Sequence, residues 1–102
     1  MRISTILQVT ALLLASAIPG YGADPDHGLA LAKRWCAACH VVSQEQQRAN
    51  ADAPPFATIG RSPNFDARHL AYFLLNPHPK MPDLPLSRAA ADDIAAYIAT
   101  LK

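Results

Sequence analysis

The chain has 102 residues, with nine Lys or Arg against eight Asp or Glu, which gives a formal net charge of +1 at pH 7. So balanced a charge argues against a basic nucleic-acid-binding surface, and no polybasic segment is present that would hold an anionic membrane. The length suffices for one domain and not for two.

The first 22 residues are typical of a secretory signal peptide. Arg2 gives a positive start, residues 6–18 form an apolar run, and small residues follow it. The run is shorter than the roughly 20 residues of a membrane-spanning helix, so we expect cleavage and no stable membrane insertion afterwards. The mature domain, residues 23–102, would then hold eight basic and eight acidic side chains and act as a soluble periplasmic protein.

Three stretches of the mature chain show helical periodicity, and none shows the alternation of a strand. We expect these helices at residues 28–35, 66–75 and 87–101. Each has, at its start or shortly before it, a side chain that caps helix N-termini. These are Asp24 or Asp26, Asp66, and Ser87. The sequence therefore predicts an all-α domain.

Two segments between the expected helices are loops. Residues 44–52 are polar and lead into Pro54 and Pro55, which cannot both lie inside a helix. The segment NPHPKMPDLPLS, residues 76–87, contains four prolines, which hold its backbone extended and stiff.

The two cysteines of the chain lie close together in the segment CAACH. Cys36, Cys39 and His40 stand at positions i, i+3 and i+4, which share one face of a helix, so we expect them on the buried face of the first helix. Two thiols can add to the vinyl groups of a haem while the imidazole binds its iron. The pattern is a c-type haem attachment signature.

Three other uses of the cysteines are weighed against haem. A redox-active dithiol is usually placed after a strand, and no strand pattern precedes Cys36. A structural zinc site needs four ligands, and no second closely spaced pair of ligands is present. The histidines available to it are His27, His69 and His78. A bare disulfide would close a loop too short to stabilise the fold much.

A haem iron held by one histidine needs a second axial ligand unless it binds a gas or peroxide. Met81 is the only methionine of the mature chain, and it lies between Lys80 and Pro82 in the stiff loop rather than on a helix face. We expect Met81 to be that ligand, with His78 as its rival. Methionine–histidine ligation raises the reduction potential relative to two histidines.

These residues resemble the class I c-type cytochromes, over nearly all of the mature chain. Gly28 stands eight residues before Cys36, as a helix glycine of that family does, and Tyr97 matches the aromatic of its C-terminal helix. The resemblance implies three main helices around one covalently bound haem c, with the N- and C-terminal helices crossed where only glycine lets them approach.

The resemblance also implies roles for the segment APPF. The carbonyl of Pro54 would accept a hydrogen bond from the ring of the axial histidine, and Phe56 would pack against the haem. The sequence departs from the family at Trp35, which is adjacent to Cys36, whereas the family usually has an aromatic three or four residues before its first motif cysteine.

The expected function is transfer of single electrons between periplasmic redox partners, such as a dehydrogenase, a reductase or a terminal oxidase, and not enzymatic catalysis. Two alternatives remain. In the first, the chain is not a free monomer but a subunit docked on one dehydrogenase. In the second, Met81 leaves the iron readily and the chain is a haem peroxidase. Candidates for contacts with an acidic partner are Lys33, Arg34 and Lys80. Residues 23–102 carry no net charge, so long-range electrostatic steering of a partner should be modest.

Overall fold

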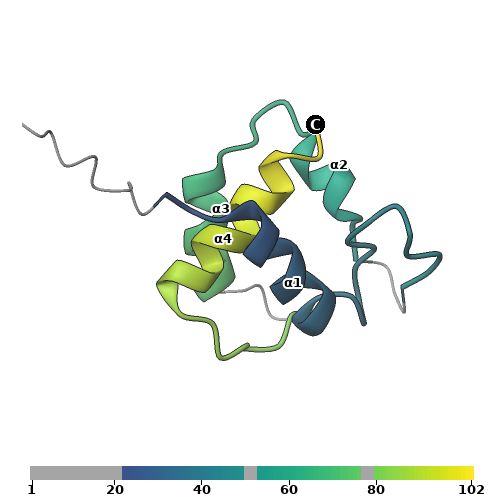
Figure 1. Cartoon of the computed structure of the whole chain (residues 1–102), viewed down its shortest axis with the longest axis horizontal. Coiled ribbons are helices and arrows are strands. Elements are labelled where there is room, and N and C mark those ends of the chain that lie inside the picture. The colour runs from purple at the N-terminus through teal and green to yellow at the C-terminus, as the bar shows by residue number, and fades with distance from the viewer. Residues whose placement is uncertain (1–21, 50–52, 77–79) are drawn as a thin grey trace, which may run out of the picture.

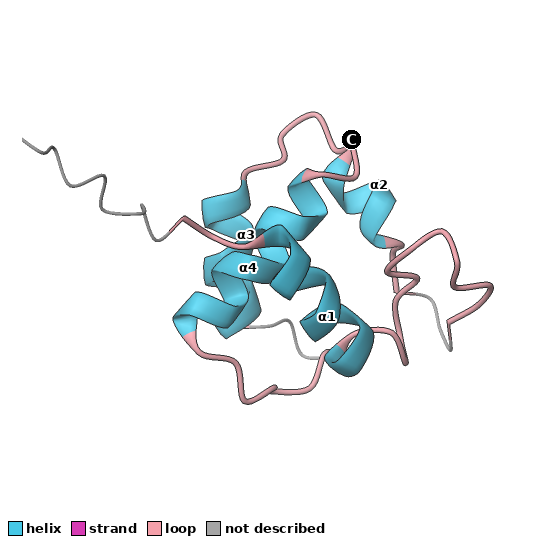
Figure 2. Cartoon of the chain, in the orientation of Figure 1, coloured by secondary structure: helices cyan, strands magenta, loops and turns pink. Residues whose placement is uncertain are grey.

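The computed structural model describes residues 22–49, 53–76 and 80–102, which form helices and loops (Figure 2). The helices are α1 (Pro25–Trp35), α2 (Phe56–Gly60), α3 (Ala67–Leu75) and α4 (Arg88–Ala99). None of these described residues lies in a strand, which confirms the predicted all-α class. The expected signal peptide, apart from Gly22, lies outside the described residues. In the part of the chain that is described, no helix is long and apolar enough to cross a membrane.

Side-chain caps start the three longer helices at the predicted positions. Asp24 caps α1, because its carboxylate accepts hydrogen bonds from the amides of Asp26 and His27 at 3.0 and 3.2 Å. Asp66 caps α3 and Ser87 caps α4 in the same way. Each cap satisfies amide hydrogens that a helix N-terminus leaves without partners. The last helix ends at Ala99, slightly before the expected end at residue 101.

Helix α1 crosses α4, as Figure 1 shows, and Gly28 lies at their contact. Gly28 is buried, and a Cβ atom built there would overlap the backbone carbonyl of Asp93 and lie 2.9 Å from Cβ of Tyr97. The two backbones therefore touch at this point, and no larger residue fits between them. The crossing of the N- and C-terminal helices is confirmed.

Helix α4 forms the centre of the molecule, with α1, α2 and α3 packed against it. Ile94 and Ile98 of α4 are fully buried, and Gly60 of α2 lies against the backbone of Ile98. Helix α2 was not predicted from the sequence. It has only five residues, which is too short for an apolar period to show.

A second connection between the two crossed helices involves the carboxylate of Asp93. One oxygen accepts a hydrogen bond from the backbone amide of Asp24 at 2.7 Å, and the other lies 2.6 Å from Nδ1 of His27. Burial raises the pKa of Asp93, but the hydrogen bonds from His27 and Asp24 and the charge of His27 outweigh it, so the pKa is below its usual value. The ionised carboxylate thus stabilises the crossing.

We expect Asp93→Asn to lower the free energy of unfolding at pH 7 by about 1 kcal/mol, because the amide keeps an acceptor for Asp24 but loses the charge opposite His27. A depressed carboxyl pKa stabilises the fold above the unfolded value of about 3.9, and this contribution is lost as pH falls through the folded value. The difference between wild type and variant should therefore shrink below about pH 4. Urea titrations at several pH values measure this difference in unfolding free energy. A difference that stays the same in acid would contradict a stabilising role of the ionised Asp93 carboxylate.

Candidate functional site

The CAACH segment lies in a turn just after α1. The amide of His40 donates to the carbonyl of Cys36 at 2.9 Å, and the amide of Cys39 donates to the same carbonyl at 3.1 Å. These bonds keep one local helical turn, so the three side chains stay close together although α1 ends at Trp35. The prediction that both cysteines lie on a buried helix face was wrong in part. Cys36 is 4% exposed, whereas Cys39 is exposed to solvent.

The ring of His40 contacts two groups that follow it in the chain, Pro54 of the loop and Phe56 at the start of α2. Its Nδ1 lies 2.7 Å from the carbonyl oxygen of Pro54, as the resemblance implied. A carbonyl can only accept, so Nδ1 carries the proton, and Nε2 of a neutral ring keeps its lone pair free. The buried ring of Phe56 lies 5.2 Å from the imidazole, centroid to centroid. His40 is thus oriented with one nitrogen available to a metal.

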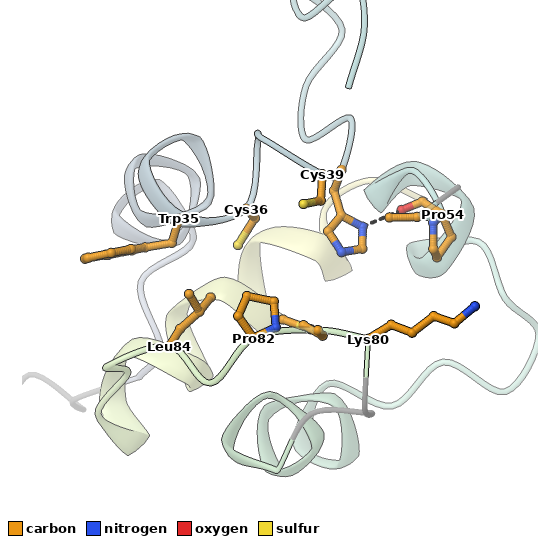
Figure 3. Close-up of a pocket in the computed structure, with 10 residues that line it drawn as sticks. Trp35, Cys36, Cys39, Pro54, Lys80, Pro82 and Leu84 are labelled. Atoms are coloured by element: carbon orange, nitrogen blue, oxygen red, sulfur yellow. Dashed lines mark hydrogen bonds between the residues drawn. The ribbon is translucent and has the colours of Figure 1, made fainter. Parts of the chain in front are cut away.

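A cavity of about 300 Å³ is lined by the predicted site residues except Phe56, which contacts the ring of His40 instead. Its lining comes from three segments: Trp35, Cys36, Cys39 and His40; Ala53 and Pro54; and Lys80, Met81, Pro82 and Leu84. Figure 3 shows the two cysteines on one wall and Pro82 and Leu84 on the opposite wall. A mainly apolar cleft with a few convergent donor groups is typical of cofactor sites, and this volume lies at the lower end of their range.

The competing uses of the cysteines receive no support from the described residues. Burial and, to a smaller extent, the charge of Cys39 together raise the pKa of the Cys36 thiol to about 11, whereas the attacking cysteine of a dithiol oxidoreductase needs a lowered pKa. Both cysteines are free rather than paired in a disulfide. In residues 22–49, 53–76 and 80–102, no three His, Cys, Asp or Glu side chains are grouped to hold a metal ion. His78 lies outside these ranges.

Trp35, where the sequence departs from the family, contributes to one end of the cavity. Its ring is half-buried, and the guanidinium of Arg34 lies 5.0 Å from the ring centroid. In Figure 3 the indole extends away from Cys36 on the side of Leu84. Trp35 is therefore both a wall of the cavity and part of a cation–π contact at the surface.

Two contacts of the site were not expected from the sequence. The hydroxyl of Tyr97 donates to the carbonyl of Val42, which joins the helix crossing to the chain just after His40. The side chain of Gln46 makes four hydrogen bonds to backbone groups, three of them within residues 37–42. The polar run that contains Gln46 indicates a loop, but nothing in it distinguishes this glutamine from Gln44 and Gln47.

A helical domain in which a CAACH turn and a methionine line one cavity has the features of a covalent haem protein. Comparison with known proteins agrees. The chain is 56% identical over 88 residues to a cytochrome c-552 from Bradyrhizobium diazoefficiens, an alignment that covers 86% of this chain and 85% of the relative. No protein-family model matches the chain, and the search of solved structures found no significant match. The chain belongs to the c-type cytochromes, which carry electrons on a covalently bound haem.

Proposed function

We propose that this chain is an exported monohaem electron carrier in which Cys36 and Cys39 attach the haem and His40 and Met81 hold its iron. The proposal depends on one observation above the others: these four residues line the same cavity, although Met81 is far from the other three in the sequence. Two thiols, an imidazole and a thioether are the donor set of a c-type haem with methionine–histidine ligation. When bound, the haem supplies an iron that gains and loses one electron.

The role of His40 follows from its hydrogen bond. Because Nδ1 donates to Pro54, the neutral tautomer presents Nε2 as the metal-binding nitrogen, and the ring cannot rotate without breaking that bond. The hydrogen bond also makes the imidazole a stronger donor toward a metal. The loop that carries Pro54 therefore prepares His40 for ligation.

The role of Met81 follows from its backbone. Met81 is half-buried at the cavity and is followed by Pro82, whose ring restricts the chain. A restrained loop limits how far the thioether can move from the site. With both His40 and Met81 to hold it, the iron would gain and lose an electron with little movement of these side chains, which would keep the barrier to electron exchange low.

We expect Met81→Ala to abolish the far-red sulfur-to-iron absorption of the ferric protein while the haem stays covalently attached. The control is Leu84→Ala, which changes another residue lining the same cavity but removes no candidate ligand. Visible and far-red spectra of the purified holoproteins measure this. A band that survives in Met81→Ala contradicts the assignment. If His78 rather than Met81 held the iron, the wild-type protein itself would lack this band, which would equally contradict the assignment.

The segment of residues 1–22 supports export to the periplasm, where the partners would be a dehydrogenase, a reductase or a terminal oxidase. Lys80 is exposed at the rim of the cavity, close to where a partner would approach. The equal numbers of acidic and basic residues in the mature chain argue for short-range docking rather than long-range attraction. Gel filtration of cell extracts distinguishes a free carrier, which elutes near its own mass, from a subunit docked on one dehydrogenase.

A further inference from the structure

The side chain of Gln46 is half-buried, whereas its neighbours Glu45 and Gln47 are exposed. Its Oε1 accepts a hydrogen bond from the amide of Val42 at 3.0 Å. Its Nε2 lies 2.9 Å from the carbonyl oxygen of Ala37, 2.9 Å from that of His40 and 3.1 Å from that of Arg48. One amide group thus serves four backbone groups, with its two N–H donors shared among three acceptors.

Three of these four partners lie in the CAACH segment or within two residues after it. Ala37 lies between the two cysteines, His40 is the proposed ligand, and Val42 is buried and also accepts the hydroxyl of Tyr97. Each carbonyl or amide would otherwise need water or another partner, because a turn leaves these groups outside a helix or sheet. Gln46 therefore closes the turn from the side of the loop.

We propose that Gln46 is a positioning residue of the haem site, which fixes the orientation of His40 by holding the backbone of residues 37–42. The proposal depends on the proposed ligation by His40. Pro54 holds the imidazole at Nδ1, and Gln46 holds the main-chain carbonyl of the same residue. With the ring and the backbone of His40 both fixed by one loop, the plane of the imidazole has little freedom to rotate.

Glutamine suits this position because it both accepts and donates at the end of a long side chain. Glutamate would keep an acceptor for Val42 but could not donate to the three carbonyls. Methionine would keep a similar length and lose all four bonds. Gln47, one residue further and exposed, offers matched controls in Gln47→Glu and Gln47→Met.

The test compares these four variants with wild type as holoproteins, whose covalent haem keeps them assembled. We expect Val42 amide hydrogen exchange to be about tenfold faster in Gln46→Met than in Gln47→Met. In ferric NMR spectra, the haem methyl shifts, which report the orientation of the axial histidine, should move in both Gln46 variants and stay in place in both Gln47 variants. The far-red sulfur band should remain in all four.

Unchanged haem methyl shifts in both Gln46 variants would overturn the proposal, even with faster Val42 exchange, because Gln46 would then stabilise the loop without orienting the ligand. Equal shifts in the Gln46 and Gln47 variants would overturn it as well. Failure of the proposed function looks different: the wild-type protein itself would lack the low-spin spectrum of histidine–methionine ligation.

Discussion

Replacing both Cys36 and Cys39 by alanine is expected to yield a chain without covalently bound haem. The proposed thioether bonds need the two sulfur atoms, and without them the cavity would hold a haem only through His40, Met81 and an apolar lining. A domain of this size buries little surface without a cofactor, so the variant should also lose much of its helical structure. Haem staining after denaturing electrophoresis and far-ultraviolet circular dichroism measure the two effects.

Single variants provide the controls for this prediction. Cys36→Ala and Cys39→Ala should each keep one thioether and retain haem after denaturation, at a lower yield than wild type. Alanine at position 36 replaces a buried side chain, whereas position 39 is exposed, so Cys36→Ala should be the less stable of the two. Haem retained by the double variant after denaturation would contradict the attachment sites.

Gly28→Ala is expected to lower the free energy of unfolding by about 2 kcal/mol. The added Cβ overlaps the carbonyl of Asp93, and a backbone atom cannot move aside unless α1 and α4 separate. Overpacking typically costs about 1–3 kcal/mol, and the gain of about 1 kcal/mol from helix propensity offsets only part of it. Urea unfolding followed by circular dichroism measures the change.

Ala30→Val is the matched control, because it also adds carbon atoms to α1 but at an exposed position. The loss of unfolding free energy in Ala30→Val should stay within about 0.7 kcal/mol, the range of ordinary helix propensities. A Gly28→Ala protein as stable as this control would show that the crossing tolerates a side chain, against the contacts described above.

The helices that the sequence predicted well are those whose signals are local. Asp66 and Ser87 start α3 and α4 through bonds to amides three residues ahead, and such bonds depend on the nearby chain alone. Helix α2 has no cap side chain of this kind, and it depends on packing against α4. The expected end of the first helix at residue 35 agrees with α1, but the exposure of Cys39 was missed, because the apolar period continues through the cysteines.

The functional site shows the same difference between features with a local sequence signal and features that depend on distant contacts. The spacing of Cys36, Cys39 and His40 is local and indicates their chemistry directly, whereas Met81 was inferred because no other methionine exists in the mature chain. The bond between His40 and Pro54 was expected from the family resemblance and is present. The contacts of Gln46 depend on how a polar loop folds back on the turn, and no periodic or compositional signal reports that.

The most direct test of the account is the absorption spectrum of the purified ferric holoprotein, recorded from the Soret region to the far red before and after adding hydrogen peroxide. A carrier with His40 and Met81 on the iron should show a low-spin spectrum with the sulfur-to-iron band, and peroxide should change it only slowly. A high-spin spectrum that reacts at once with peroxide would show an open iron site and contradict the claim that His40 and Met81 both hold the iron.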